Sequence, residues 1–179
     1  MHATVIDANV FHAFFYETFQ GKPHDERTGS ALQIFGTLGN KLVAFLDTGK
    51  IIESEWRQVC VGASEWFNAW LEDSLIQGHI FEVESSTDRN LSKRYCAAGF
   101  PRGRDICYVR VAHGLTQICK RTNPWLVAED IDFFDPTKKA AGKKAEVLKA
   151  GQGPIAKLLR DDGIRVACIK TFSDHIAAQ

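Results

Sequence analysis

The sequence has no apolar run long enough to cross a membrane, no cysteine pair spaced for metal binding, and no excess of charge of either sign. Its longest apolar runs, such as 42–46, span about five residues, whereas a membrane helix requires roughly 20. The 22 basic and 22 acidic residues cancel, so net charge indicates no class of partner. The five cysteines form no C-x-x-C pair and the six histidines are scattered, which favours reduced thiols over a zinc site or a disulfide framework.

The first residues also lack the pattern of a signal peptide, because no positively charged start precedes an apolar run. We therefore expect a cytoplasmic protein without a membrane partner. With 179 residues, of which 45% are hydrophobic and 11% aromatic, the chain has the composition of one globular domain. We expect a single domain over residues 1–179 with a lysine-rich insertion at about 137–160, which could serve as a substrate-binding arm.

Short β-rich apolar runs alternate along the chain with stretches of helical periodicity. The runs that predict strands are 3–6, 42–46, 80–83, 125–128 and 164–168. Helical patterns follow the first run and cover 30–38, 51–59, 64–76 and 106–119, whereas 21–26 has loop chemistry and 85–104 is polar and basic. This order predicts an α/β fold: a single domain with a mostly parallel central sheet of four or five strands and helices on both faces.

Acidic residues stand where several of these elements meet. Asp7 follows the first strand, Asp130 follows the strand at 125–128, and Asp105 opens the helix at 106–119. Because the carboxyl ends of parallel strands meet at one edge of a sheet, these side chains have a structural reason to converge. Converging carboxylates repel unless a cation compensates them, and oxygen ligands without Cys or His suit Mg²⁺ or Mn²⁺ far better than zinc.

Further acids compete for a place in such a site. Taken singly, an acid after a strand is typical of a turn, and one before a helix is typical of a cap. Glu53 and Glu55 lie about 200° apart around a helix, so only one of them can face the site, and we choose Glu55. Asp132 is counted as an additional metal ligand or, like Asp47, as a residue outside the ligand set.

Four short motifs stand out in this sequence. They are I-D-A-N-V-F at 6–11, the pair Glu55–Trp56, Arg104–Asp105 at the start of an amphipathic helix, and L-V-A-E-D-I-D-F at 126–133. Together they resemble the PIN-domain nucleases. The likeness extends from residue 3 to about 135 and includes the last strand near 164–172. It departs from the family at Ala128 and Glu129, where a small hydroxyl residue more often precedes the fourth acid.

This resemblance implies a PIN-like fold and a metal-dependent endoribonuclease, in which Mg²⁺ or Mn²⁺ activates the water that hydrolyses the phosphodiester bond. By position, the catalytic and metal-binding acids of this family correspond here to Asp7, Glu55, Asp105 and Asp130. The implied substrate is RNA, with single-stranded DNA as a further substrate. Family members include toxins, so an antitoxin or other protein partner and a homodimer also belong to the expectation.

Two basic segments flank the third and fourth acids. The nucleic-acid-binding residues that we expect in them are Arg102, Arg104, Lys138, Lys139, Lys143 and Lys144. The alternative for each segment is a solvated charged face. For the whole chain, the alternative is a catalytically silent PIN-fold module that binds RNA or protein. A phosphatase of D-x-D type is disfavoured, because Asn9 stands where its second acid is required.

Overall fold

The computed structural model of the chain describes residues 1–20, 26–118 and 123–179. The predicted loop at 21–25 and the predicted helix end at 119 lie outside these residues. The described strands are β1 (His2–Ile6), β2 (Leu42–Asp47), β3 (Ile80–Val83), β4 (Trp125–Val127) and β5 (Arg165–Ala167). The described helices are α1 (Ala8–Gln20), α2 (Glu26–Phe35), α3 (Ile51–Val59), α4 (Ser64–Ile76), α5 (Leu91–Ala97), α6 (Ile106–Ile118), η1 (Ile131–Phe133), η2 (Pro136–Ala141), α7 (Lys144–Ala150), α8 (Pro154–Asp161) and α9 (Ile169–Ala177).

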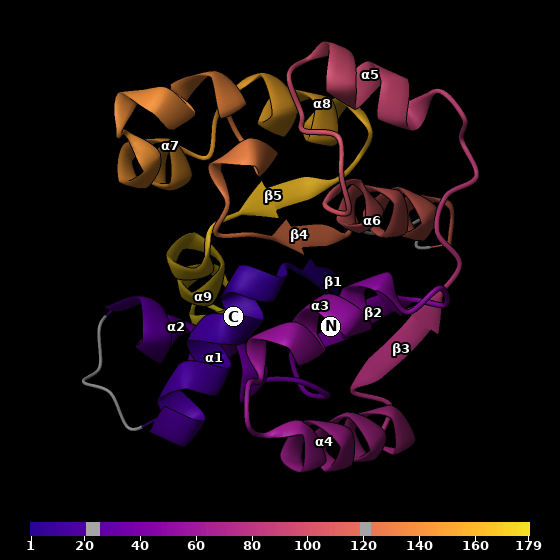
Figure 1. Cartoon of the computed structure of the whole chain (residues 1–179), viewed down its shortest axis with the longest axis vertical. Coiled ribbons are helices and arrows are strands. Elements are labelled where there is room, and N and C mark those ends of the chain that lie inside the picture. The colour runs from indigo at the N-terminus through magenta and orange to yellow at the C-terminus, as the bar shows by residue number, and fades with distance from the viewer. Residues whose placement is uncertain (21–25, 119–122) are drawn as a thin grey trace.

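The five strands form one sheet in the order β3-β2-β1-β4-β5, and every neighbouring pair is parallel. This confirms the predicted α/β class. The chain first builds outward from β1 to β3 and then returns past β1 to β4 and β5, so its direction reverses between β1 and β4. Figure 1 shows the sheet crossing the molecule, with α1, α2, α4 and α9 on one side and α5, α6, α7 and α8 on the other. Right-handed crossovers that reverse direction place helices on both faces in this way.

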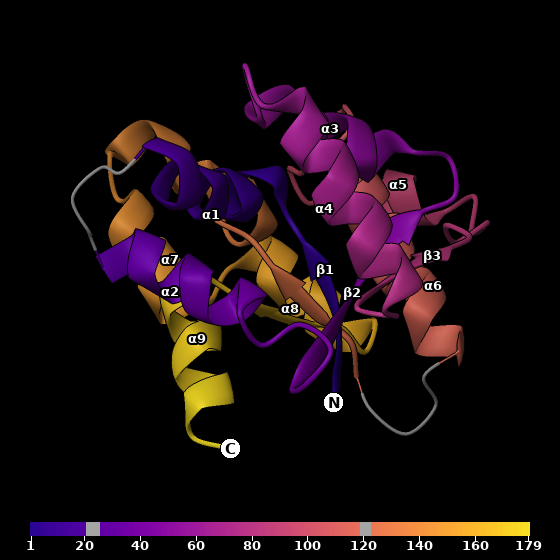
Figure 2. The ribbon, with the colours of Figure 1, turned by 90° about the horizontal axis from the view of Figure 1, so that it is seen from below.

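An aromatic core fixes the helices that lie against β1. Phe11 of α1 and Trp56 of α3 stack with ring centroids 4.6 Å apart and an interplanar angle of 3°. The Trp56 indole also donates to the carbonyl of Ile6 at 3.1 Å, so α3 is attached to the last residue of β1. On the other side of α1, helix α2 lies between α1 and α9, as seen from below in Figure 2. The core therefore holds the ends of β1 and α3 next to each other.

The structure differs from the sequence prediction in three segments. The predicted helix at 30–38 begins earlier, at Glu26, and the basic segment 85–104 contains α5, which only Leu91 and Tyr95 anchor in the core. The lysine-rich segment at about 137–160, for which no elements were predicted, forms η2, α7 and α8 between β4 and β5. Its apolar residues are few but buried, among them Leu148 and Leu159. Among the described residues, no helix is long and apolar enough to span a bilayer.

Helix α6 contacts β1, β2, β3 and β4, and one of its glycines permits a close approach to the chain after β3. A Cβ on Gly114 would lie 2.9 Å from the Glu84 carbonyl oxygen, whereas a Cβ on the helical Gly29 would meet no atom within 4 Å. Because the obstructing atom belongs to the backbone, a side chain at Gly114 would have to displace α6. The first turn of α6 is the part that matters for the acids described below.

We expect Gly114→Ala to lower the free energy of unfolding by about 1–3 kcal/mol, because the steric conflict outweighs the gain in helix propensity. The matched change Gly29→Ala should raise it by about 1 kcal/mol, since only the propensity changes there. Urea denaturation of both variants and the wild type measures the difference. Stabilisation by both substitutions would contradict the close approach of α6.

Candidate functional site

Asp7 is a buried acid at the end of the central strand, with 4% of its surface exposed. Its backbone N–H donates to Val127 of β4 at 2.9 Å, and its carbonyl accepts from Val10 of α1 at 2.9 Å. Its carboxylate oxygen Oδ2 accepts from the Asn9 amide at 3.2 Å and from the Glu129 backbone N–H at 3.4 Å. These bonds hold the carboxylate at the reversal between β1 and β4, where ligands of open parallel sheets bind.

The electrostatics of Asp7 link it to two of the other predicted acids. Burial raises the pKa of its carboxyl group from 3.8 to about 7, although the bonds from Asn9 and Glu129 oppose this. The charges of Asp105 and Asp130 contribute to this raised pKa. Asp105 and Asp130 therefore lie close enough to Asp7 for their charges to act on its carboxyl group.

Glu55 is connected to the end of β1 by hydrogen bonds of Tyr108. The Tyr108 hydroxyl donates to Glu55 Oε2 at 2.6 Å and accepts from the backbone N–H of Ala8, which follows Asp7, at 3.2 Å. The negative charge of Glu55 also raises the pKa of Asp105. Because burial and nearby carboxylates favour the neutral phenol, the pKa of Tyr108 is raised well above its ordinary value. Tyr108 therefore stays a hydrogen-bond donor that orients Glu55.

The alternative acid Glu53 faces another part of α3. Its carboxylate accepts from Arg57 at 2.8 Å and lies 3.1 Å from the Lys50 ammonium. Burial raises the pKa of Glu53, but Arg57 and Lys50 together lower it below its ordinary value. Glu53 is thus already neutralised by two cations, and the structure brings Glu55 rather than Glu53 to the other acids.

Asp105, Asp130 and Asp132 complete the group. Burial raises the pKa of Asp105, and the charges of Glu55, Asp130 and Asp132 raise it further, whereas Lys139 lowers it. Asp130 accepts from the Asp132 backbone N–H at 3.0 Å and caps η1. The buried Asp132 carboxylate accepts from the Lys139 ammonium at 2.6 Å. Lys139, which we expected to contact nucleic acid, is therefore paired with one of these acids and acts on the charge of another.

Two other buried acids cap helices. Asp47, at the end of β2, accepts from the backbone N–H groups of Ile51 and Ile52 at 2.9 and 2.8 Å. Glu129 accepts from the backbone N–H of Ile169 at 2.9 Å, at the start of α9. Helix N-termini favour such carboxylates, so both burials have a structural cause. Asp47 lies outside the acid group. Glu129, which departs from the PIN family pattern, accepts the hydrogen bond at the start of α9 instead.

The remaining basic residues of the prediction are exposed. Arg102 and Arg104 lie on the loop directly before Asp105, and Arg102 also lines a pocket. Lys143 lies 4.0 Å from Glu146, a distance at which two exposed side chains interact weakly. The four lysines of the prediction in the segment that follows Asp130, Lys138, Lys139, Lys143 and Lys144, are all exposed. Their positions are open to a large anionic partner.

The acids form a charged group rather than a closed metal cage. In the described parts of the chain, no three side chains of His, Cys, Asp or Glu are arranged so that they could hold a metal ion. Several of the acids instead accept from a protein group, as Asp7 does from Asn9 and Asp132 from Lys139. The donor set itself fits Mg²⁺ or Mn²⁺, because it consists of carboxylate oxygens with no thiol or imidazole.

Models of known protein families and curated protein sequences give no match to this chain. The likeness to PIN domains accordingly rests on the four motifs. Sequence reasoning missed Tyr108, although its spacing of three residues from Asp105 on a helix places both on one face. It also missed the bonds of Asn9 and Glu129, which no pattern in the sequence indicates.

We expect Asp7→Asn to stabilise the metal-free protein above about pH 7. Folding raises the pKa of Asp7 from 3.8 to about 7, so the folded state holds the proton more tightly. The free energy of unfolding of the wild type should therefore fall as pH rises from about 4 to about 7, by roughly 1.4 kcal/mol per unit at most, and stay low above that. The asparagine variant lacks this loss.

Thermal melts in EDTA between about pH 4 and about pH 8 measure the effect. Asp174→Asn, a change at an exposed acid of α9, is the control and should follow the wild type. A large loss of stability in Asp7→Asn at every pH would show instead that Asp7 serves as a hydrogen-bond acceptor that the fold requires.

Proposed function

We propose that this chain is a PIN-type, Mg²⁺- or Mn²⁺-dependent nuclease that hydrolyses phosphodiester bonds in RNA. The observation that carries the proposal is the buried Asp7, whose pKa is raised to about 7 by burial and by the charges of Asp105 and Asp130. Acids grouped in this way at the reversal point of a parallel sheet are best explained by a cation that they share. The order of these acids along the chain is also the order of the PIN motifs.

The residues of the site fall into metal ligands and residues that orient those ligands. The ligands would be Asp7, Glu55, Asp105 and Asp130, with Asp132 as a further candidate once Lys139 leaves it. A divalent cation, when bound, would stabilise charge on the phosphate and favour deprotonation of the attacking water. Tyr108 orients Glu55 and Asn9 orients Asp7 through the bonds described above. No side chain is required as a nucleophile.

The basic residues contact the substrate in this proposal. Lys139 already lies beside the acids, so its ammonium can pass from Asp132 to a phosphate oxygen. Arg102 and Arg104 precede Asp105, and Lys138, Lys143 and Lys144 neutralise the strand farther from the reacting bond. We place the protein in the cytoplasm, with RNA as substrate, single-stranded DNA as a further substrate, and an antitoxin, another protein or a second copy of the chain as partner.

The second candidate function is a catalytically silent PIN-fold module that binds RNA or protein. One observation favours it: the Lys139 ammonium already pairs with Asp132 at 2.6 Å, and a lysine can supply part of the charge that a metal supplies elsewhere. Such a module would retain the acids without using them for catalysis, and would bind RNA or protein without cleaving RNA.

A cleavage assay decides between these functions. We expect the wild type to cut labelled RNA with Mg²⁺ or Mn²⁺ and not in EDTA, because the metal carries the charge that develops on the phosphate. Asp7→Asn and Asp130→Asn should each lower the rate at least about 100-fold. Asp174→Asn, at an exposed acid that pairs with Lys170 on α9, is the control and should cleave like the wild type. RNA binding without metal-dependent cleavage would establish the silent module.

A pair of tyrosine variants tests the support of Glu55. The Tyr108 hydroxyl donates to Glu55 at 2.6 Å, and the Tyr95 hydroxyl donates to Asp162 at 3.0 Å, away from the acids. Tyr95→Phe removes one bond and should cost about 1–2 kcal/mol of stability, whereas Tyr108→Phe also removes the bond from the Ala8 N–H and should cost about 2–3 kcal/mol. Only Tyr108→Phe should also lower the cleavage rate, by about tenfold, because Glu55 loses its orientation. Equal cleavage rates in the two variants would remove Tyr108 from the site.

A further inference from the structure

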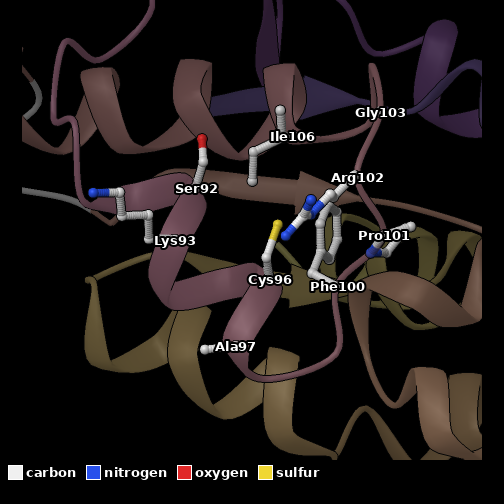
Figure 3. Close-up of a pocket in the computed structure, with 9 residues that line it drawn as sticks. All are labelled: Ser92, Lys93, Cys96, Ala97, Phe100, Pro101, Arg102, Gly103 and Ile106. Atoms are coloured by element: carbon white, nitrogen blue, oxygen red, sulfur yellow. The ribbon is translucent and has the colours of Figure 1, made fainter.

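A pocket of about 610 Å³ lies between α5, the loop that follows it and the start of α6, and its lining residue Ile106 directly follows Asp105. Small-molecule sites commonly have about 300–1,000 Å³, so the pocket is large enough for a nucleobase with its sugar. Figure 3 shows the side chains that line it, which come from α5, from 100–103 and from Ile106.

The lining combines an apolar wall with positive charge. Phe100, Pro101 and Ile106 form part of the wall, and Lys93 and Arg102 are its two cations. None of the nine lining residues is acidic. In Figure 3, Arg102 extends past Phe100 toward Cys96, whereas the Lys93 ammonium is turned outward at the opposite end. The chemistry therefore suits a ligand that joins a flat apolar group to an anion.

The wall of the pocket is held rigidly. Phe100 is buried, and its ring centroid lies 6.1 Å from that of Tyr95 and 5.3 Å from that of Phe133. Phe133 follows Asp132 in η1, so the same ring contact joins the pocket to the segment that carries the acids. A preformed wall binds its ligand with little loss of conformational entropy.

The pocket is also close to the acids along the chain. Ile106 directly follows Asp105, and Arg102 precedes Asp105 by three residues. Three residues extend over at most about 11 Å, so a phosphate at Arg102 belongs to a nucleotide near the one at the acids. Arg102 and Lys93 lie at different ends of the pocket, which gives a bound strand a direction.

We propose that this pocket holds the base of one unpaired nucleotide of a nucleic-acid strand, with the phosphate of that nucleotide against Arg102. The identity of the ligand as nucleic acid rests on the proposed function. A base in a duplex is stacked and paired and cannot enter, so the pocket selects single-stranded RNA or an unpaired loop. The selection comes from the pocket, and the acids supply none of it.

Fluorescence anisotropy tests the pocket without cleavage. A labelled single-stranded RNA of about ten nucleotides is titrated in EDTA with the wild type and four variants. Ala97→Trp fills the pocket from an exposed position of α5, and Arg102→Ala removes the phosphate contact. The matched controls are Ala177→Trp, at an exposed alanine of α9, and Arg89→Ala, at an exposed arginine before α5.

We expect Ala97→Trp and Arg102→Ala to raise the Kd for the single strand about tenfold, and the controls to raise it less than about twofold. A duplex of the same sequence should bind more weakly and should not respond to Ala97→Trp. Melting temperatures equal to that of the wild type show that the variants fold, and Arg102→Ala, on an exposed loop, provides a second reading if Ala97→Trp does not.

Unchanged affinity in both pocket variants, or an equal effect of Ala97→Trp on the duplex, would overturn the pocket as a nucleotide site. These outcomes are separate from those of the cleavage assay, because EDTA prevents metal-dependent cleavage. Pocket-dependent binding without any metal-dependent cleavage would support the nucleotide site and overturn the nuclease. Metal-dependent cleavage with unchanged RNA affinity in both pocket variants would support the nuclease and overturn the nucleotide site.

Discussion

A carboxylate buried at the end of the central strand constrains the rest of this molecule. Asp7 cannot turn toward solvent, because its backbone joins β1 to β4 through Val127 and starts α1 through Val10. Its side chain is therefore held where the chain reverses direction, and burial raises its pKa to about 7. The bonds from Asn9 and Glu129 reduce this effect but do not remove it. The buried charge of Asp7 must therefore be neutralised by a proton or a cation for the folded protein to be stable, whether or not a reaction takes place there.

The buried acids of the protein fall into two kinds, and backbone N–H groups separate them. Asp47 accepts from two N–H groups of α3, and Glu129 accepts from one of α9, so each is stabilised by a helix terminus. Asp7 receives its backbone bond at 3.4 Å, the long end of the accepted range, and lies near the negative charges of Asp105 and Asp130. The first kind explains itself through structure. Asp7, the second kind, requires positive charge that the strand ends do not provide. This difference distinguishes the candidate site from the helix caps.

The sequence allowed the sheet to be predicted because its strands are short, apolar and bounded by turns, and the helices 51–59 and 64–76 match α3 and α4. Glu55 was named from its place in the motif Glu55–Trp56, and the structure shows that the neighbouring Trp56 lies in the core, where it bonds to β1. The position of Lys139 could not be predicted, since it depends on a tertiary contact with Asp132 across η1 and η2. Helix α5 was not predicted because it buries only two residues, Leu91 and Tyr95, and two positions do not establish helical periodicity.

The ion pair between Lys139 and Asp132 bears on the choice between the two candidate functions. The Lys139 side chain is 62% exposed but that of Asp132 is only 6% exposed, so the lysine can leave Asp132 only if another cation takes its place. Lys139 also fails to compensate the group, because the pKa of Asp105 remains raised although Lys139 lowers it. One positive charge therefore does not balance acids that lie on α3 and η1, directly after β1 and directly before α6. The charge still lacking is what a divalent cation supplies, and on this ground we favour the nuclease over the silent module.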